Sequence, residues 1–224
     1  SEYRSWERSI PALRADLMSA GLSDVEMLFE YQLPLTSKRA DVVLVGQHPK
    51  TGGPSYLVVE LKQWSRAERF EDSDTLVRIE QYGERPVTHP ILQVRGYCDY
   101  MLGFTAVLAD HPASLAGVAY LHNATDSGVD DLFRIPGDQF GSVFTGQRRA
   151  EFQTFLRSRF AEGRSGAQHA VVLLSSRIAP SRQLLALAAE EVQHREMFVL
   201  IDEQLDAFNY VVHAVERARR SDTK

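Results

Sequence analysis

Two apolar runs decide the fold of this chain, RADVVLVG at residues 39–46 and SYLVVELK at residues 55–62. Their β-branched residues predict two buried strands, and a period of two places Glu60 and Lys62 on one face of the second strand. The intervening segment is rich in proline and glycine, which predicts a turn. We therefore expect a hairpin that brings Asp41, near the start of the first run, close to Glu60.

This juxtaposition predicts a site for a divalent cation. Two carboxylates, from Asp41 and Glu60, with help from a main-chain carbonyl such as that of Leu61, are the hard oxygen ligands that Mg²⁺ or Mn²⁺ binds. A bound cation neutralises phosphoryl oxygens and activates water, as phosphodiester cleavage requires. Lys62 would orient that water or stabilise developing charge. Glutamate and lysine two residues apart also occur as solvated surface charges, but here both follow an uninterrupted apolar run.

A helix is predicted over residues 88–102, with Pro90 in its first turn. Its apolar residues recur at helical spacing. Gln93 and Tyr97 are four residues apart, so they lie on one helix face and can reach the same neighbour. The alternative is a half-buried tyrosine beside a surface amide.

Asp41, the Glu60-Leu61-Lys62 motif and the Gln93-x-x-x-Tyr97 helix together resemble the PD-(D/E)xK nuclease superfamily, in its RecB-like branch. The resemblance covers roughly residues 1–125. It implies an α/β, restriction-endonuclease-like core, a central mixed sheet flanked by helices, followed by an α-helical C-terminal extension. It also implies that the two acids bind Mg²⁺ or Mn²⁺, that the lysine assists the water, and that the glutamine and tyrosine support the site or the DNA.

The family often places another acid in its first helix. Residues 6–17 predict such a helix, and Glu7 is the candidate metal ligand within it. Glu30, in the strand-like run at residues 25–33, competes for the role. Either acid can instead be a solvated surface charge.

The charge balance does not indicate nucleic-acid binding, because the formal net charge is −5. Binding depends on the local face rather than on the sum. We expect the DNA-binding face to consist of cationic residues near the predicted site, namely Lys38, Arg39, Arg66, Arg69 and Arg95. The alternative for each is a solvated side chain.

Composition is that of an ordinary globular protein. The chain has 224 residues, 44% of them hydrophobic, which is enough for a large core. Neither a membrane-length apolar stretch nor a signal peptide is visible in the sequence, so we expect a cytoplasmic protein without a membrane partner. A single cysteine, Cys98, excludes an internal disulfide. The seven histidines show no HExxH pattern, which argues against zinc.

The chain beyond residue 125 carries no second catalytic pattern. We expect a helical and loop extension over residues 126–200. Residues 198–210 resemble the lead-in to a superfamily 1 helicase motor, and we assign residues 201–224 to it. Because no phosphate-binding loop of the type GxxxxGK(S/T) occurs in the sequence, we expect a piece of a bacterial nuclease–helicase fusion. The alternative is an ordinary terminal helix capped by Asp202.

Three functions follow as hypotheses. The first is a metal-dependent deoxyribonuclease, normally fused to an ATP-driven helicase. The second is a catalytically silent nuclease-fold module that binds DNA or docks the motor, since fold alone does not license function. The third is a metal-free domain whose charged trio is an ion-pair network, and it predicts that Lys62 pairs with Glu60.

Overall fold

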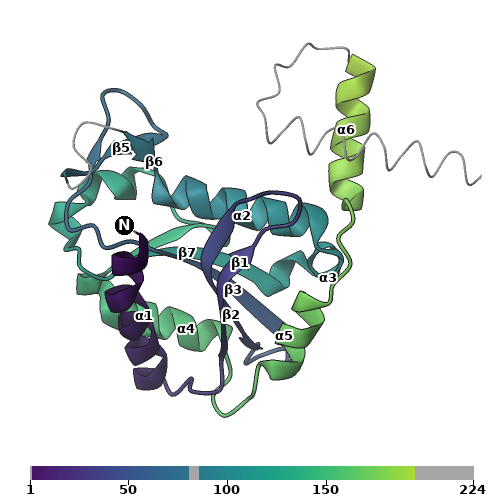
Figure 1. Cartoon of the computed structure of the whole chain (residues 1–224), viewed down its shortest axis with the longest axis horizontal. Coiled ribbons are helices and arrows are strands. Elements are labelled where there is room, and N and C mark those ends of the chain that lie inside the picture. Colours follow the sequence, from purple (N-terminus) through teal and green to yellow (C-terminus); the bar gives the residue numbers. More distant parts are fainter. Residues whose placement is uncertain (1, 81–85, 195–224) are drawn as a thin grey trace, which may run out of the picture.

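The computed structural model describes residues 2–80 and 86–194, with the backbone alone for residues 2–7 and 189–194. The protein is α/β, with a five-stranded mixed sheet packed against helices and a small antiparallel sheet (Figure 1). The large sheet contains β1 (Glu26–Gln32), β2 (Arg39–Gln47), β3 (Pro54–Leu61), β7 (Leu115–Leu121) and β8 (Ser142–Thr145). The small sheet contains β4 (Glu68–Arg69), β5 (Leu76–Arg78) and β6 (Val87–Thr88). The helices are α1 (Glu2–Ser19), α2 (Pro90–Phe104), α3 (Ala106–Ala109), α4 (Arg149–Arg159), α5 (Ala167–Leu174) and α6 (Arg182–His194).

The order of strands in the large sheet is β1-β2-β3-β7-β8. The first three strands form an antiparallel meander, while β7 runs parallel to β3 and β8 parallel to β7. The expected hairpin is confirmed: Val42 of β2 pairs with Val59 of β3, one position inward from Asp41 and Glu60. The chain crosses from β3 to the parallel β7 through α2, so α2 passes over the strand that ends in the charged motif.

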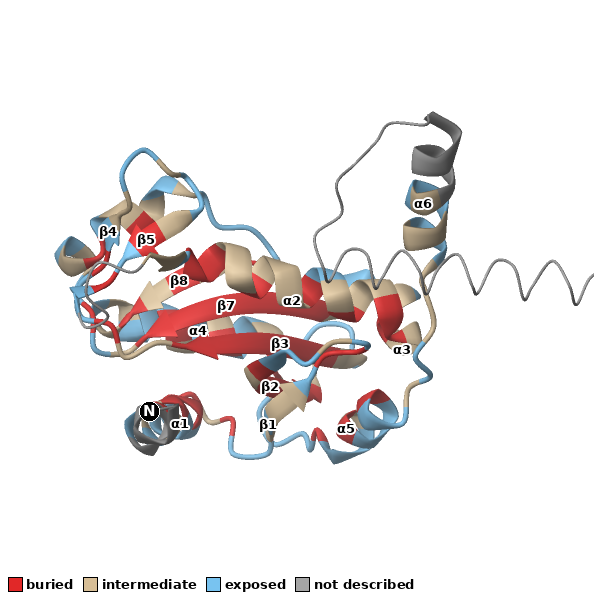
Figure 2. Ribbon diagram, turned by 45° about the horizontal axis from the view of Figure 1, so that its top comes forward, coloured by how far each residue is buried: buried red, intermediate tan, exposed pale blue. Residues whose placement is uncertain are grey.

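Helices cover both faces of the sheet, and β3 and β7 are buried along nearly their whole length between them (Figure 2). The helices α2 and α5 pack on the face that holds Tyr56 and Val58 of β3. The helices α1 and α4 pack on the opposite face, against Leu57, Val59 and Leu61. By the period of two, Glu60 and Lys62 lie on the α2 face.

The strand β8 and the helix α4 belong to the same layers, although they follow residue 125, the expected end of the core. Both β7 and β8 are hydrogen-bonded in one sheet, and α4 packs against β8, β3 and α1. The helix α6 extends away from the sheet (Figure 1). The expected motor lead-in at 201–224 lies outside the described residues. In the part of the chain that the structure describes, no helix combines the length and apolar character needed to cross a membrane.

A buried aspartate ties the two helices of the α1/α4 face to β7. Asp16 is fully buried and accepts hydrogen bonds from the Tyr120 hydroxyl (2.7 Å), Arg149 Nε (2.5 Å) and Gln153 Nε2 (2.8 Å). These donors offset the cost of burying its charge. The network fixes α1 against β7, the strand that pairs with β3 on the side opposite β2.

The close approach of α2 to the sheet depends on Gly117 in β7. A Cβ added there would lie 2.4 Å from Val94 Cγ1 and 2.5 Å from the Phe140 carbonyl oxygen. We expect Gly117→Ala to lower the free energy of unfolding by about 2 kcal/mol, because helix and strand must separate. Urea denaturation measures this, with Gly103→Ala as the control because a Cβ at Gly103 makes only an ordinary 3.6 Å contact. Equal stability of the two variants would contradict this packing.

Candidate functional site

The structure brings Asp41, Glu60, Lys62, Gln93 and Tyr97 together. The end of β3 supplies Glu60, and Lys62 follows directly after it, with its backbone N–H bonded to the Tyr120 carbonyl of β7 at 3.0 Å. The first turns of α2 supply Gln93 and Tyr97 on one face, at the spacing expected from the sequence. The site thus lies where the end of β3 meets the N-terminal half of α2.

One oxygen of Glu60 is the centre of the hydrogen-bond network. Glu60 Oε1 accepts from Lys62 Nζ at 2.5 Å and from Gln93 Nε2 at 2.7 Å. Lys62 Nζ also donates to Gln93 Oε1 at 3.1 Å, and Gln93 Nε2 lies 2.7 Å from the Tyr97 hydroxyl. The second oxygen, Glu60 Oε2, is buried and has no hydrogen-bond partner. Burying a carboxylate oxygen without a donor is costly, and a bound cation would offset that cost.

Asp41 is the second carboxylate of the site. Its Oδ2 accepts from the backbone N–H of Leu61 at 2.8 Å, which holds it beside the end of β3. Burial, and then the neighbouring charge of Glu60, raise the pKa of Asp41 from 3.8 to about 7. Burial also raises the pKa of Glu60, against the opposing charge of Lys62. Since burial is the first cause of both shifts, each carboxylate is costly to ionise here unless a neighbouring positive charge compensates it.

The phenol of Tyr97 stays protonated in this environment. Burial, followed by the charge of Glu60, raises its pKa to about 12. Tyr97 is therefore a hydrogen-bond partner of Gln93 rather than a base at neutral pH.

A third acid, Glu30, stands across from Asp41. On β1, Phe29 pairs with Val42 and Tyr31 with Ala40, so the register places Glu30 opposite Asp41. Its φ of 49° lies in the left-handed region, which costs a residue with a side chain about 1–2 kcal/mol. The charge of Glu30 contributes to the raised pKa of Asp41, while its carboxylate pairs with Arg39 at 3.3 Å. Backbone strain of this kind clusters at functional sites.

The structure places the two other expected metal ligands, Glu7 and Leu61, differently from Asp41 and Glu60. The backbone of Glu7 lies in α1, but its side chain is outside the described residues. Leu61 uses its N–H to hold Asp41. Within residues 8–80 and 86–188, no group of three or more His, Cys, Asp or Glu side chains is placed to hold a metal ion. The ligand set available there is the pair Asp41 and Glu60.

A pocket of about 490 Å³ opens beside this network. Lys62, Gln93 and Tyr97 form part of its wall, so it is continuous with the charged site. The ammonium of Lys62 also lies 5.1 Å from the centre of the Trp64 ring, within the range of a cation–π contact. Sequence reasoning missed the contribution of Trp64, although its position two residues after Lys62 places it on the same side of an extended chain.

The expected DNA-binding residues have different surroundings. Lys38 lines the pocket, and Arg66 is exposed in the segment between β3 and β4. Arg39 is exposed and paired with Glu30. Arg95 bonds the Pro136 carbonyl at 2.7 Å and pairs with Asp138 at 2.8 Å, linking α2 to the loop before β8.

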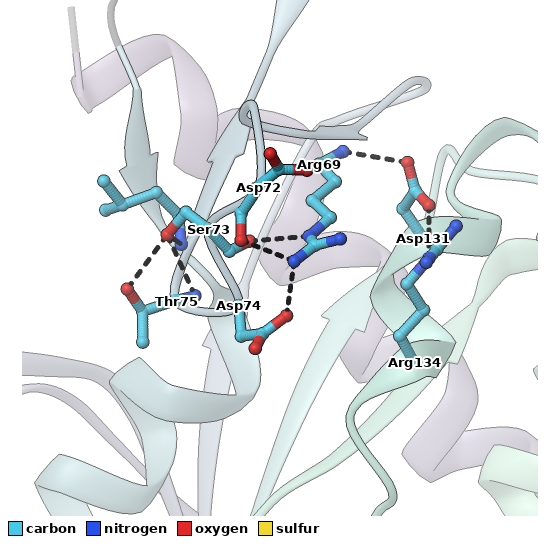
Figure 3. A network of polar contacts seen from close by, with 8 residues as sticks. Arg69, Asp72, Ser73, Asp74, Thr75, Asp131 and Arg134 are labelled. Carbon is cyan, nitrogen blue, oxygen red and sulfur yellow. Dashed lines mark hydrogen bonds and ion pairs between the residues drawn. The ribbon is translucent and has the colours of Figure 1, made fainter.

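Arg69 organises the loop between β4 and β5 (Figure 3). Its guanidinium donates to the carbonyls of Asp72 and Ser73 and pairs with the Asp74 carboxylate at 2.7 Å. Its backbone N–H donates to Asp131, which also binds Arg134. Arg69 thus ties this loop to the 3₁₀ helix at Asp130–Arg134 and does not line the pocket.

Comparisons with known proteins add no assignment. The chain matches no protein-family model, no curated protein and no solved structure.

Proposed function

We propose that this chain is a metal-dependent nuclease domain that hydrolyses DNA phosphodiester bonds. One observation carries the proposal. Two carboxyl groups with raised pKa values, Asp41 and Glu60, lie beside Lys62 and Gln93, which line a pocket, and one oxygen of Glu60 is buried without a partner. An ion pair between Glu60 and Lys62 would need neither a second buried carboxyl, Asp41, nor an adjoining pocket.

The residues present fit a hard divalent cation. Asp41 and Glu60 would hold Mg²⁺ or Mn²⁺, with the unpartnered Oε2 of Glu60 as the oxygen that lacks any other ligand. When bound, such an ion neutralises phosphoryl oxygens and lowers the pKa of water.

The chain's own residues have separate roles in this proposal. Lys62 orients the attacking water and stabilises charge that develops on the phosphate. Gln93 holds both Glu60 and Lys62 in place through its two amide atoms, and Tyr97 fixes the orientation of that amide. Glu60 and Lys62 are therefore held by an element other than their own strand, which is the preorganisation that a reaction centre needs.

The architecture is consistent with this assignment. An antiparallel meander, followed by a helix and a parallel strand, with helices on both faces of the sheet, fits the restriction-endonuclease-like core expected from the sequence motifs. We assign the domain to the RecB-like branch on the five motif residues, and we propose a helicase motor downstream in the parent chain.

A second candidate rests on a specific contact. The short Lys62–Glu60 pair, at 2.5 Å, is what an ion-pair network without metal would contain. In that case the domain holds no metal, and it serves either as plain structure or as a DNA-binding or docking module. Calorimetric titration with Mn²⁺ separates the two candidates, because only a metal site binds the ion and releases protons as Asp41 ionises.

The proposed function is tested by incubating the chain with end-labelled DNA, single-stranded and duplex. We expect cleavage that requires Mg²⁺ or Mn²⁺, stops when EDTA is added, and resumes when the metal is restored in excess. Cleavage that continues in EDTA would contradict the proposed metal site. Absence of cleavage of both substrates in saturating Mn²⁺ would favour the docking module.

A further inference from the structure

Trp64 lies beside the ammonium of Lys62 and also belongs to the hydrophobic core. Lys62 Nζ is 5.1 Å from the centre of the Trp64 ring, inside the limit of about 6 Å for a cation–π contact. Trp64 is only 2% exposed and is part of the core cluster that includes buried residues of β2, β3 and α2. Both side chains line the pocket of about 490 Å³. The ring is therefore a fixed part of the wall beside which the ammonium lies.

The backbone around Trp64 is held by the loop that follows β7. The N–H of Ala67 donates to the carbonyl of Gly128 at 3.0 Å. A Cβ added to Gly128 would lie 2.4 Å from the carbonyl oxygen of Ser65, so this loop and the segment that carries Trp64 approach closely. Core packing and these backbone contacts determine the position of the ring, and Lys62 is not needed for it.

Lys62 is held by one charged group and two uncharged groups. Glu60 Oε1 supplies the negative charge at 2.5 Å, and Gln93 Oε1 accepts a hydrogen bond at 3.1 Å. The third group is the ring of Trp64. A lysine side chain loses much rotamer freedom when it is fixed, so several contacts are needed to hold its ammonium in one place. Under the proposed function a cation takes up the charge of Glu60, whereas Trp64 carries no charge that a cation can take up.

We infer that Trp64 is a positioning residue of the site, because its ring face holds the Lys62 ammonium at the wall of the pocket. The inference rests on the proposed function, which requires Lys62 to face a phosphate in that pocket. The core alone does not require this residue type, since other large apolar side chains also fill core positions. Tryptophan gives the strongest cation–π contact of the aromatic residues. Trp64 acts on the reaction only through Lys62.

The test is a double-mutant cycle between the charge of Lys62 and the ring of Trp64, measured by urea denaturation in EDTA. Tryptophan with one, two or four fluorine atoms is incorporated at residue 64 alone, and Trp6 is left unaltered. Fluorine reduces the negative potential on the ring face and so weakens a cation–π contact, with little change in shape. The same series in Lys62→Met, which keeps an apolar stem without the charge, is the matched control. Any effect of fluorine on packing is common to both series.

We expect four fluorine atoms to raise the equilibrium constant of unfolding about fivefold more in the chain with Lys62 than in Lys62→Met. One and two fluorine atoms should give intermediate differences. A second measurement leaves residue 62 unchanged. In nitrogen-15 NMR spectra, hydrogen exchange between the Lys62 ammonium and water should become several-fold faster as fluorine is added to Trp64. In Mg²⁺, the fully fluorinated chain should cleave DNA several-fold more slowly than the unaltered chain.

Equal effects of fluorine in the two series would overturn the inference. So would hydrogen exchange at Lys62 that does not respond to fluorine, or an unchanged rate of cleavage. A chain that cuts no DNA at all in Mg²⁺ or Mn²⁺ would instead count against the proposed function. The cycle in EDTA requires neither metal nor cleavage, so it decides separately whether Trp64 holds Lys62.

Discussion

Asp41→Asn is expected to abolish cleavage and at the same time to stabilise the metal-free protein. Loss of a carboxylate that holds the cation should reduce the cleavage rate by roughly 10³-fold or more. The same change removes a charge that the folded state disfavours. An asparagine oxygen can still accept from the Leu61 N–H, which Asp41 now binds at 2.8 Å. At about pH 8 in EDTA, the free energy of unfolding should rise by up to roughly 4 kcal/mol.

The direction of the expected stability change in Asp41→Asn follows from how the stability of the protein depends on pH. Asp41 has a pKa of about 7 in the folded protein and 3.8 as its ordinary value, so between these values the folded state binds more protons than the unfolded state. The titration of Asp41 therefore lowers the free energy of unfolding as the pH rises from about 4 to about 7. Asp41→Asn should flatten this decline with pH, which urea denaturation at a series of pH values measures. Asp110→Asn, at an exposed aspartate, is the control, and equal slopes in the two variants would refute the raised pKa.

Lys62→Ala is expected to abolish cleavage and to destabilise the metal-free protein. The Glu60 side chain is only 4% exposed and would lose its closest positive charge. Removing one partner of a buried pair costs about 3–5 kcal/mol, because the other charge is left uncompensated. We expect a loss near the lower limit at about pH 8 in EDTA, since Lys62 is 17% exposed.

Added Mg²⁺ should restore part of the stability of Lys62→Ala, because a cation on Glu60 replaces the missing charge. Thermal unfolding with and without Mg²⁺ measures this rescue. Lys50→Ala, at an exposed lysine in the β2–β3 turn, controls for the loss of a positive charge. If Lys62→Ala cleaves normally and is as stable as Lys50→Ala, then Lys62 is a surface charge and the site is wrongly assigned.

The part of the fold around the site could be predicted because it depends on local pattern. The β-branched runs of β2 and β3 and the turn between them determine the hairpin, and the period of two then determines which side of β3 carries Glu60. Helical spacing likewise places Gln93 and Tyr97 on one face of α2. These relations follow from spacing along the chain and not from contacts between residues far apart in sequence.

The remaining features depend on contacts between residues far apart in the chain. Asp16 is buried because Arg149 and Gln153, more than a hundred residues later, supply its donors. Arg69 is held by its own loop and by Asp131. No local sequence pattern distinguishes it from a solvent-exposed arginine. The left-handed backbone of Glu30 also has no signature in the sequence, because such strain is imposed by the surrounding sheet.

The most direct test of the central claim, that Asp41 and Glu60 hold a catalytic cation, is a crystal structure of the chain soaked with Mn²⁺ and recorded at the manganese absorption edge. We predict an anomalous peak in contact with both carboxylates, with Oε2 of Glu60 as one ligand, and loss of that peak in Asp41→Asn. No peak at millimolar Mn²⁺, with Lys62 and Gln93 still bonded to Glu60 as they are now, would contradict the metal site and leave an ion-pair network in its place.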